Sequence, residues 1–461
     1  MTLIRSISGI RGTIGGKAGE GLTPADVVRY VSGYCSWLKE KTKKNKLLVI
    51  VGRDARISGA VVNSLVCSTF NSCGADVIDI GLATTPTVEV AIPFYNADGG
   101  IIITASHNPA QWNALKLLNG LGEFVSAKDG ERILHFAETA ETEYCQVEEL
   151  GSYTQNNEFL KEHIRQVLAL SLVNVEKIKA ANFSVVVDPV NSVGAIAVPA
   201  MLEALGVKNV ICINEEANGQ FAHNPEPLPE HLVDLSKKVI ETKSHLGIAV
   251  DPDVDRLALV CEDGKMFGEE YTLVAVADYV LNHKKGNTVS NLSSSLALRD
   301  VTESKGCSYF ASAVGEVNVV EMMKEKNAVI GGEGNGGIIY PELHYGRDAL
   351  VGIALFLSHL ADQKISCSAL RKNYPDYFMS KNKIALKPGM DVQNIFAKMK
   401  ELYSKQPVST IDGLKISLDK EWVHLRTSNT EAIIRVYAES TSAENADKLA
   451  QRVMSEINSL A

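Results

Sequence analysis

Three aspartates at every second position of the stretch "AVDPDVDRLALV" are the clearest sign of chemistry in the sequence. Asp251, Asp253 and Asp255 stand between two apolar runs. Carboxylates this close repel one another unless they share a cation. Ligation by oxygen alone suits a hard ion, and Mg²⁺ prefers a few carboxylates together with phosphate oxygens and water. The spacing therefore predicts a Mg²⁺ site at the end of a buried strand.

Two alternatives for this turn are weaker. An EF-hand calcium loop would place Glu262 at its twelfth position, but Arg256 stands at the sixth, where that loop needs glycine. An apolar run also follows the turn, where the EF-hand has a helix. A merely solvated acidic turn is disfavoured because such turns seldom lie between two buried strands.

A serine and a histidine stand side by side in "ITASHNPAQWNALK", which suggests a hydrolase. The nucleophile elbow G-x-S-x-G is absent around Ser106. Neighbouring side chains of an extended chain diverge, which would leave His107 poorly placed to deprotonate Ser106. A serine that faces three metal-holding aspartates could instead carry a phosphoryl group. Lys116 could then supply positive charge or exchange protons, although a solvated surface lysine is an equally simple explanation.

Two later stretches carry groups that bind sugars and phosphates. In "VIGGEGNGGIIYPE", Glu333 and Asn335 lie in a glycine-rich loop, where backbone approaches a ligand closely and short polar groups bind hydroxyls. The stretch "HLRTSNTEAIIRVYAES" combines arginines, which match phosphate bidentately, with hydroxyl and amide groups. A polar hairpin with surface arginines is the alternative. The candidates in this stretch are Arg426, Ser428, Asn429, Thr430 and Arg435.

The elements that must position these residues alternate between short apolar strands and amphipathic helices. Buried strands with helical crossovers indicate covered, largely parallel sheets. Three strands end in similar turns, "VIVGRDAR", "VVVDPVNSVG" and "IAVDPDVDR", a weak repeat typical of related modules. A third round begins at "RLALVC", and past residue 372 the alternation favours antiparallel strands. We expect an α/β fold of three related modules with mixed, mostly parallel sheets and a smaller α+β domain, with domains at 1–148, 149–256, 257–372 and 373–461.

Composition narrows the function classes. The 461 residues allow about three to four domains, and 45% hydrophobic with 22% charged residues is ordinary for a globular protein. A formal net charge of −9 argues against a general binder of nucleic acid or membrane surfaces. The start of the chain lacks an export signal, and no run approaches the roughly 18 apolar residues of a membrane span, so we expect a cytoplasmic protein. The eight scattered cysteines are expected to be buried, reduced thiols.

Taken in order, four stretches resemble the signature loops of the α-D-phosphohexomutase superfamily, and the likeness spans the whole chain. They are "TASHNP" (104–109), "DPDVDR" (251–256), "GGEGNGG" (331–337) and "RTSNTEAIIR" (426–435). The resemblance implies four domains around a central cleft and an isomerase that moves phosphate between O6 and O1 of a hexose phosphate. It also implies a phosphoserine at Ser106, Mg²⁺, and a hexose 1,6-bisphosphate that is both intermediate and activator.

The resemblance further implies roles for individual residues. Ser106 and the three aspartates would ligate the metal, while Arg11, His107 and Arg256 would complete the catalytic group with Lys116 as the acid–base residue. Glu333 and Asn335 would bind sugar hydroxyls. The terminal loop would grip the phosphate that is not transferred, through Arg426, Ser428, Asn429, Thr430 and Arg435.

One departure bears on the substrate. Many members read G-E-x-S-G-H in the sugar loop, whereas here Asn335 and Gly337 replace the serine and the histidine, and His344 could substitute for the latter. The G-E-G-N-G-G version resembles archaeal-type phosphoglucosamine mutases. The expected reaction is therefore glucosamine 6-phosphate to glucosamine 1-phosphate, with phosphomannomutase or phosphoglucomutase specificity as the alternative.

Two other functions stay open. A Mg²⁺-dependent phosphatase with an aspartyl nucleophile would leave Ser106 and the C-terminal arginines without a role. A non-catalytic sugar-phosphate sensor would need no metal loop. The expected partner is a hexose phosphate, with no nucleic acid and no membrane, and the chain is expected to be a monomer or a homodimer.

Overall fold

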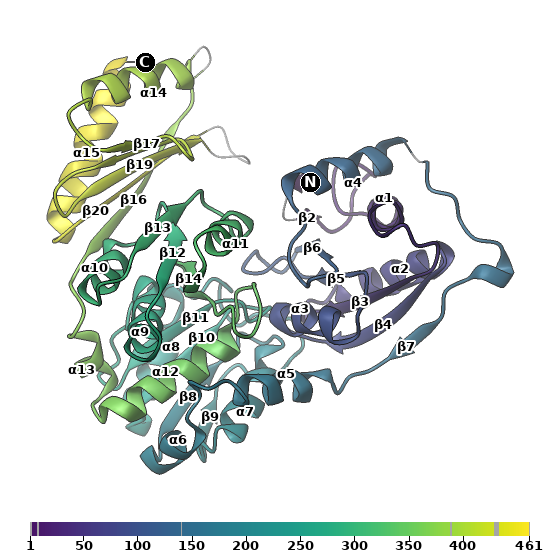
Figure 1. Cartoon of the computed structure of the whole chain (residues 1–461), viewed down its shortest axis with the longest axis horizontal. Helices are drawn as coiled ribbons and strands as arrows, with labels where there is room; N and C mark the ends of the chain where they lie inside the picture. Colours follow the sequence, from purple (N-terminus) through teal and green to yellow (C-terminus); the bar gives the residue numbers. More distant parts are fainter. Residues whose placement is uncertain (1, 7–8, 140, 388–389, 428–432, 461) are drawn as a thin grey trace. The chain divides into compact units, whose positions relative to one another are not determined.

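The computed structural model describes residues 2–6, 9–139, 141–387, 390–427 and 433–460, and Figure 1 traces them along the chain. They form two compact units. Unit 1 runs to Thr272 and includes the later segment Asn335–Arg371, whereas unit 2 comprises Leu273–Gly334 and the chain from Lys372 onward. The chain therefore leaves unit 1, returns to it once, and leaves it again.

Unit 1 begins with a seven-stranded mixed sheet in the order β1-β2-β6-β5-β3-β4-β7. The strands β5, β3, β4 and β7 run parallel, and β1, β2 and β6 are antiparallel neighbours. The bounds are β1 (Leu3–Ser6), β2 (Gly9–Thr13), β3 (Leu47–Arg53), β4 (Ala75–Leu82), β5 (Gly99–Ile103), β6 (Trp112–Asn119) and β7 (Tyr153–Gln155).

Helices cover both faces of this sheet. On one face α1 (Pro24–Thr42), α2 (Gly59–Ser72) and α4 (Ala127–Thr139) share a core with the side chains of Val49 and Val51. On the other face α3 (Thr85–Phe94) and α5 (Phe159–Leu168) share a core with Ile50. Successive side chains of a strand point to opposite faces, so the unbroken apolar run of β3 reflects burial on both sides.

The second sheet of unit 1 has the order β11-β10-β8-β9. Its first three strands along the chain are parallel, whereas β11 is antiparallel to β10. The prediction that β11 opens the third module is wrong, because residues 251–256 are too few for a helical crossover and the chain turns back beside β10. The bounds are β8 (Ser184–Asp188), β9 (Asn209–Cys212), β10 (Leu246–Val250), β11 (Leu257–Cys261), α6 (Val175–Ala181), α7 (Gly194–Ala204) and α8 (Val233–Thr242).

The returning segment of unit 1 is built around α12 (Ala349–Gln363), a helix that is apolar and buried over most of its length. It contacts α5, α6 and α7, although the sequence pattern had grouped it with the third module. A helix that is hydrophobic on all sides needs such complete cover. The remaining elements of unit 1 are β15 (Gly337–Ile339), α13 (Cys367–Arg371) and the short turns η1 (Val147–Glu149) and η2 (Pro229–His231).

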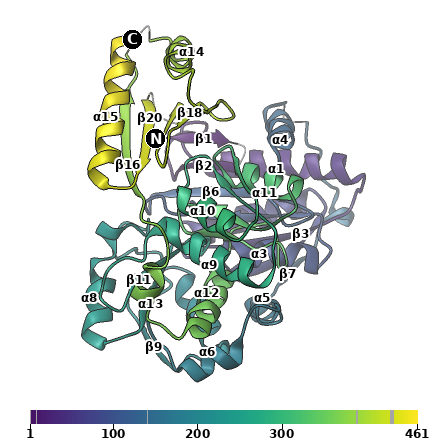
Figure 2. The same ribbon diagram turned by 60° about the vertical axis from the view of Figure 1, so that its left-hand side comes forward.

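Unit 2 contains a parallel sheet and an antiparallel sheet. The parallel strands follow the order β13-β12-β14, and the antiparallel strands the order β16-β20-β19-β18-β17. The helices α14 and α15 share one core with the antiparallel sheet, and α15 lies along it (Figure 2). This confirms the expected α+β architecture at the C-terminus.

The elements of unit 2 have the following bounds. The parallel part comprises β12 (Asn287–Asn291), α10 (Leu296–Ser304), β13 (Tyr309–Ser312), α11 (Glu316–Glu325) and β14 (Ala328–Glu333), preceded by α9 (Glu269–His283), which starts in unit 1. The antiparallel part comprises β16 (Phe378–Ala385), α14 (Val392–Leu402), β17 (Val408–Ser409), β18 (Leu414–Ser417), β19 (Trp422–Thr427), β20 (Ile433–Ser440) and α15 (Ala443–Leu460).

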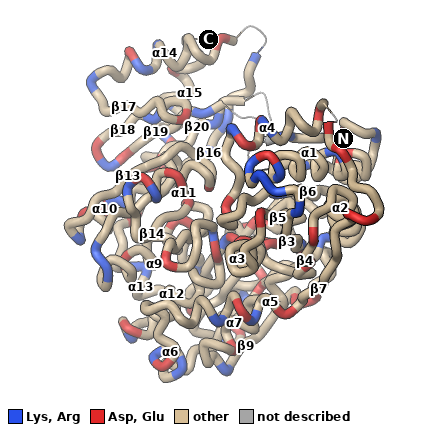
Figure 3. Tube along the Cα trace, turned by 45° about the vertical axis from the view of Figure 1, so that its right-hand side comes forward, with Lys and Arg blue, Asp and Glu red and all other residues tan. Residues whose placement is uncertain are grey.

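The surface charge is mixed, as the composition indicates. In the view of Figure 3, acidic and basic residues are interspersed over both units. Within the described ranges, every helix is too short or too polar to cross a membrane.

Candidate active site

The three aspartates of the predicted metal loop lie together after β10. Asp251, Asp253 and Asp255 are fully buried, and each offers a carboxylate oxygen within 4.8 Å of the others. The Oδ1 atoms of Asp253 and Asp255 are buried and accept no hydrogen bond from any described residue. Buried acceptors left without a donor are costly. A hard dication would satisfy both oxygens, so the donor set fits the predicted ion.

Ser106 follows β5 and faces this group. Its Oγ donates a hydrogen bond of 2.8 Å to Asp251 Oδ2, and its backbone N–H donates to Thr104 Oγ1 at 2.9 Å. The residue is 3% exposed and has a φ of 49°. This left-handed conformation is unfavourable for residues other than glycine. The loop thus places a hydroxyl against the metal loop at a cost in backbone strain.

His107 lies closer to Ser106 than we expected. Its Nδ1 is 3.3 Å from Ser106 Oγ, so the expectation that the two side chains diverge is wrong. The reason is the left-handed backbone of Ser106, which bends a chain that we had assumed to be extended. Burial, together with the charges of Arg256 and Arg11, holds the pKa of His107 well below its ordinary value. The imidazole is therefore neutral near pH 7.

Lys116 lies on β6 of the first sheet and contacts the aspartates that follow β10 of the second. Its Nζ donates to Asp253 Oδ2 at 2.6 Å and lies 3.4 Å from Asp255 Oδ2. Burial alone would lower the pKa of Lys116, but the charges of Asp253 and Asp255 outweigh burial and raise it. Burial would likewise raise the pKa of Asp253, and the charge of Lys116 lowers it instead. The lysine is 4% exposed, so a solvated surface role is excluded.

The pKa of Asp251 shifts in the opposite direction to that of Asp253. Burial, followed by the charges of Asp255 and Asp253, raises its pKa well above the ordinary value. The same carboxyl accepts hydrogen bonds from the backbone N–H groups of Asp255 and Arg256, both at 3.1 Å. Repulsion among the three carboxylates contributes to this rise, and a bound cation would relieve it.

The sequence analysis missed Arg56, which organises the serine loop. Its guanidinium is fully buried and donates from Nε to Asp54 Oδ2 at 3.0 Å. It also donates to four backbone carbonyls of the loop, namely those of Ser106, Asn108, Pro109 and Trp112. The turn "VIVGRDAR" had been noted only as a strand end, and its pairing of Asp54 with Arg56 was the available signal.

Two further contacts to the aspartates come from distant parts of unit 1. Thr85, at the start of α3, donates from Oγ1 to Asp253 Oδ2 at 2.6 Å. Arg347 donates from Nη2 to Asp255 Oδ2 at 2.8 Å. Neither residue belongs to a recognisable motif, so only the tertiary fold reveals them.

The two predicted arginines of unit 1 lie beside the same loops. Arg11, on β2, donates from Nη1 to Asn108 Oδ1 in the serine loop at 2.6 Å. Burial lowers the pKa of Arg11, and nearby arginines add to this effect. Arg256 Nη1 lies 3.4 Å from Glu226 Oε1, and its buried Nε donates to no described residue. Both guanidinium groups can therefore turn donors towards an anion.

The residues of the predicted sugar loop are divided between the units. In unit 2, Glu333 Oε1 accepts from Asn291 Nδ2 at 2.9 Å and from the backbone N–H of Gly315 at 3.2 Å. In unit 1, Asn335 Oδ1 accepts from the N–H of Gly337 at 3.3 Å. The structure thus gives Glu333 partners that hold its carboxylate in one orientation.

His344 lies in a different environment from the one we expected. Its side chain is 8% exposed, with Nε2 at 3.4 Å from Asp348 Oδ2 and Nδ1 at 3.4 Å from Glu89 Oε2. Both ring nitrogens therefore face carboxylates of unit 1. A role for His344 in binding sugar stays a prediction.

Two arginines of the predicted phosphate loop lie opposite each other. Arg426 on β19 and Arg435 on β20 are direct cross-strand partners, and Arg426 Nε lies 2.8 Å from Asp412 Oδ2. Like charges at opposing positions destabilise a sheet unless an anion lies between them. Ser428, Asn429 and Thr430 lie outside the described residues.

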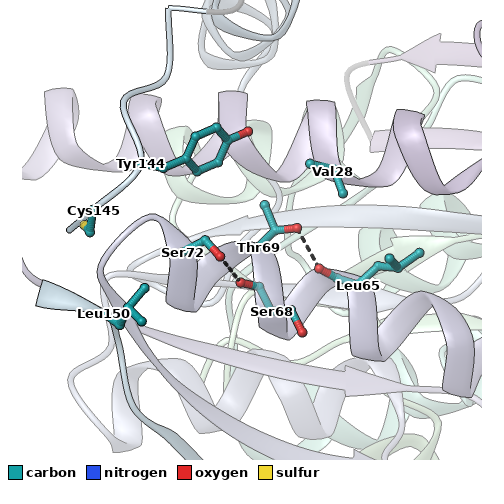
Figure 4. Close-up of a pocket in the computed structure, with 8 residues that line it drawn as sticks. All are labelled: Val28, Leu65, Ser68, Thr69, Ser72, Tyr144, Cys145 and Leu150. Carbon is teal, nitrogen blue, oxygen red and sulfur yellow. Dashed lines mark hydrogen bonds between the residues drawn. The ribbon is translucent and has the colours of Figure 1, made fainter. Parts of the chain in front are cut away.

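A pocket of ≈ 430 Å³ lies elsewhere in unit 1, beside α1 and α2 (Figure 4). Its lining combines apolar groups such as Val28 and Leu65 with hydroxyls and one thiol, and among the described residues that form it none is charged. None of its lining residues belongs to the group around Ser106.

Comparison with known proteins identifies the family. The four domain profiles of the phosphoglucomutase/phosphomannomutase family (alpha/beta/alpha domains I, II and III, and the C-terminal domain) match residues 3–144, 161–264, 268–377 and 382–456. A phosphoglucomutase/phosphomannomutase of Thermococcus kodakarensis is 36% identical over 94% of this chain and 95% of its own length. A phosphoglucosamine/phosphogalactosamine mutase of Sulfurisphaera tokodaii is 33% identical over 96% of both chains.

A solved structure agrees with these relatives. The crystal structure of a phosphoglucomutase/phosphomannomutase family protein from Burkholderia thailandensis superposes with a TM-score of 0.84 at 24% identity, covering 99% of this chain and 98% of the other. That likeness shows the shared fold. With four consecutive profiles and curated relatives above 30% identity along nearly the whole chain, the protein belongs to the phosphoglucomutase/phosphomannomutase family.

Proposed function

We propose that this phosphosugar mutase moves a phosphoryl group between O6 and O1 of a hexose phosphate through a phosphorylated Ser106. The observation that carries the proposal is the hydrogen bond of 2.8 Å from Ser106 Oγ to Asp251 Oδ2. It joins the hydroxyl to a buried group of three carboxylates and one ammonium. A hydroxyl placed against such a group is suited to carry phosphate.

We assign Mg²⁺ to the aspartates, with an oxygen of phosphorylated Ser106 as a further ligand. The support is the set of oxygen donors, two of which accept no hydrogen bond from the described residues. When bound, the ion would neutralise the charge of the phosphoryl group and polarise it for transfer. Arg11 and Arg256 would add positive charge at the same phosphate.

We assign the proton transfers that accompany phosphoryl transfer to two residues of this chain. As the sugar hydroxyl forms its new P–O bond it releases a proton, and Ser106 Oγ takes one up when its own P–O bond breaks. We assign the first proton to Lys116, which lies at the aspartates. A bound Mg²⁺ would offset the negative charges of Asp253 and Asp255 that raise the pKa of Lys116, so that its amine could take up this proton. The neutral His107, 3.3 Å from Ser106 Oγ, could pass a proton to the serine from one ring nitrogen while the other nitrogen takes one up.

The second phosphate of the bisphosphate intermediate needs its own binding group. Arg426 and Arg435, which lie opposite each other, provide paired cations for this purpose. We assign Ser428, Asn429 and Thr430 to the same phosphate, and Glu333 and Asn335 to the sugar hydroxyls. Such a grip would hold either end of a hexose 1,6-bisphosphate, because both ends present the same dianion.

Glucosamine 6-phosphate is our lead substrate, with glucosamine 1-phosphate as the product. The G-E-G-N-G-G loop and the name of the Sulfurisphaera tokodaii relative support this choice. The name of the Thermococcus kodakarensis relative supports the alternative, mannose or glucose phosphates. All eight cysteines are free thiols, which is in keeping with the reducing cytoplasm that we propose as its location.

Side-by-side assays test this proposal. Purified protein with Mg²⁺ and a trace of hexose 1,6-bisphosphate should interconvert the 6- and 1-phosphates of glucosamine faster than those of N-acetylglucosamine, mannose or glucose. Release of inorganic phosphate without isomerisation, unaffected by Ser106→Ala, would establish the phosphatase alternative instead. Tight binding of all four sugars with no turnover would point to the sensor.

A further inference from the structure

Unit 1 contains a second group of metal-ligating side chains, away from the aspartates of the metal loop. It consists of His163 on α5, which is fully buried, and of His344 and Asp348 just before α12. His163 Nε2 lies 3.0 Å and His344 Nε2 lies 3.4 Å from the same oxygen, Asp348 Oδ2. The three residues offer ligand atoms within 4.8 Å of one another.

The spacing of these atoms matches a small tetrahedral ion. With Zn–N and Zn–O distances near 2.0 Å, the ligands of a tetrahedral site are about 3.3 Å apart, and the two separations from Asp348 Oδ2 are 3.0 Å and 3.4 Å. The imidazole rings of His163 and His344 are edge-to-face, with centroids 6.4 Å apart and an interplanar angle of 85°. The two rings thus approach Asp348 Oδ2 from different directions.

The outer nitrogens of both rings are oriented as in metal sites. His163 Nδ1 lies 3.0 Å from Thr87 Oγ1, and His344 Nδ1 lies 3.4 Å from Glu89 Oε2. His344 Nδ1 is buried and makes no hydrogen bond with the described residues in the present geometry. A carboxylate behind a histidine is the usual means of fixing the ring and strengthening its bond to a metal.

The turn before α12 is shaped to admit this carboxylate. A Cβ atom at Gly346 would stand 1.9 Å from Glu89 Oε2, so any side chain there would displace it. Glu89 and Asp348 are 1% and 0% exposed, and together they carry two formal negative charges. A divalent cation would bring positive charge to both carboxylates and leave the imidazoles neutral, which lowers the cost of burying the two charges.

We propose that His163, His344 and Asp348 bind one divalent cation of the Zn²⁺ class, with Thr87 and Glu89 fixing the rings. Two imidazoles and one carboxylate suit zinc and its neighbours better than Mg²⁺, which takes oxygen ligands. The ion would be structural, and with three ligands from the protein its fourth position would be left to a water molecule. It would tie α3, α5 and the start of α12 together, and thereby hold Thr85 and Arg347, the residues that contact Asp253 and Asp255.

Metal titration of the full chain tests the proposal. Protein stripped with a chelator and titrated with Zn²⁺ or Co²⁺ should bind one equivalent that Asp253→Asn retains and that His344→Ala loses. Bound Co²⁺ should give the visible absorption of a tetrahedral site. Glu89→Gln should keep the site but weaken Zn²⁺ binding about 10- to 100-fold. These readouts do not depend on mutase activity, so they stand apart from the proposed function.

The matched control is His359→Asn, which removes another buried histidine of α12 and should leave the bound zinc unchanged. If His163→Ala fails to fold, zinc binding is compared in His344→Ala and Glu89→Gln instead. The proposal is overturned if the stripped wild-type chain takes up no stoichiometric zinc. It is equally overturned if zinc persists in both His344→Ala and Glu89→Gln at wild-type affinity.

Discussion

The guanidinium of Arg56 donates a hydrogen bond to the backbone carbonyl of Ser106. The same side chain binds Asp54 and three more carbonyls of the serine loop, and it is fully buried. One arginine therefore fixes the position of the hydroxyl that we propose carries phosphate, without touching the hydroxyl itself. These hydrogen bonds of Arg56 hold the serine loop in its conformation.

Arg56→Ala should unfold unit 1 more readily and lower mutase turnover. Removing one partner of a buried ion pair costs about 3–5 kcal/mol, because Asp54 is left charged and unpaired. Thermal unfolding followed by circular dichroism would measure the loss. Arg53→Ala, at the end of β3, is the control, since among the described residues the Arg53 side chain donates to the carbonyl of Asp54 alone, at 3.2 Å, and is partly exposed. Equal melting temperatures for the two variants would contradict this account of Arg56.

Ser106→Ala should abolish isomerisation and the phosphoprotein together. Intact mass spectrometry of the freshly purified wild type should show a fraction about 80 Da heavier than the bare chain, which is the mass of one phosphoryl group. The variant should lack this fraction. Ser64→Ala, which removes an exposed hydroxyl of α2, should keep it. A fully active enzyme that is never phosphorylated, with no bisphosphate present, would rule out the phosphoserine.

Asp253→Asn should weaken Mg²⁺ dependence and turnover in parallel. The change removes a charged ligand and the partner of Lys116, and loss of several kcal/mol of charge stabilisation corresponds to about 10²-fold or more in kcat. Turnover measured against Mg²⁺ concentration would reveal the shift. Asp263→Asn, in the exposed turn after β11, is the matched control. An unchanged Mg²⁺ profile would exclude Asp253 as a ligand.

His424 should make unit 2 less stable as the pH falls. The ring donates from Nε2 to the carbonyl of Asp412 at 2.6 Å and accepts from Ser293 Oγ at 2.9 Å, and burial lowers its pKa to about 4. Its ordinary pKa is 6.5, so between pH 6.5 and pH 4 the unfolded chain binds a proton that the folded chain does not. Stability is therefore lost as the pH falls through this window, by up to about 3 kcal/mol.

Urea unfolding of His424→Gln and of the wild type between pH 4 and pH 7 would isolate this contribution. The variant should show a flatter pH dependence than the wild type. His135→Gln, which changes an exposed histidine of α4, should not. Parallel curves for His424→Gln and the wild type would mean that the ring stays protonated in the folded state.

The sequence predicted the architecture well where periodicity and turn chemistry agree. The strands before Ser106 and Asp251 are buried on both faces, and their unbroken apolar runs predict this burial. The assignment of β11 to the third module failed because a tight return and a helical crossover begin with the same acidic turn. The apolar sequence of α12 does not predict which unit buries this helix, since a helix that is hydrophobic on all sides can pack in either unit.

The candidate site was predictable only in part. Ser106, Lys116 and the aspartates belong to short motifs, and their spacing points to the chemistry. Thr85 and Arg347 act through single side chains that long-range packing brings to the loops, so local spacing contains no trace of them, whereas the only local signal of Arg56 is its pairing with Asp54. The proposed zinc site was not predictable either, because its two histidines, His163 and His344, are far apart in the sequence and only the fold brings them together.

In the serine loop and in the metal loop, Ser106 and Val254 lie in the left-handed region, with φ of 49° and 61°. Each costs about 1 kcal/mol or more relative to glycine. Glycine would relieve this strain at both positions, but at residue 106 it would also remove the hydroxyl that we propose carries phosphate.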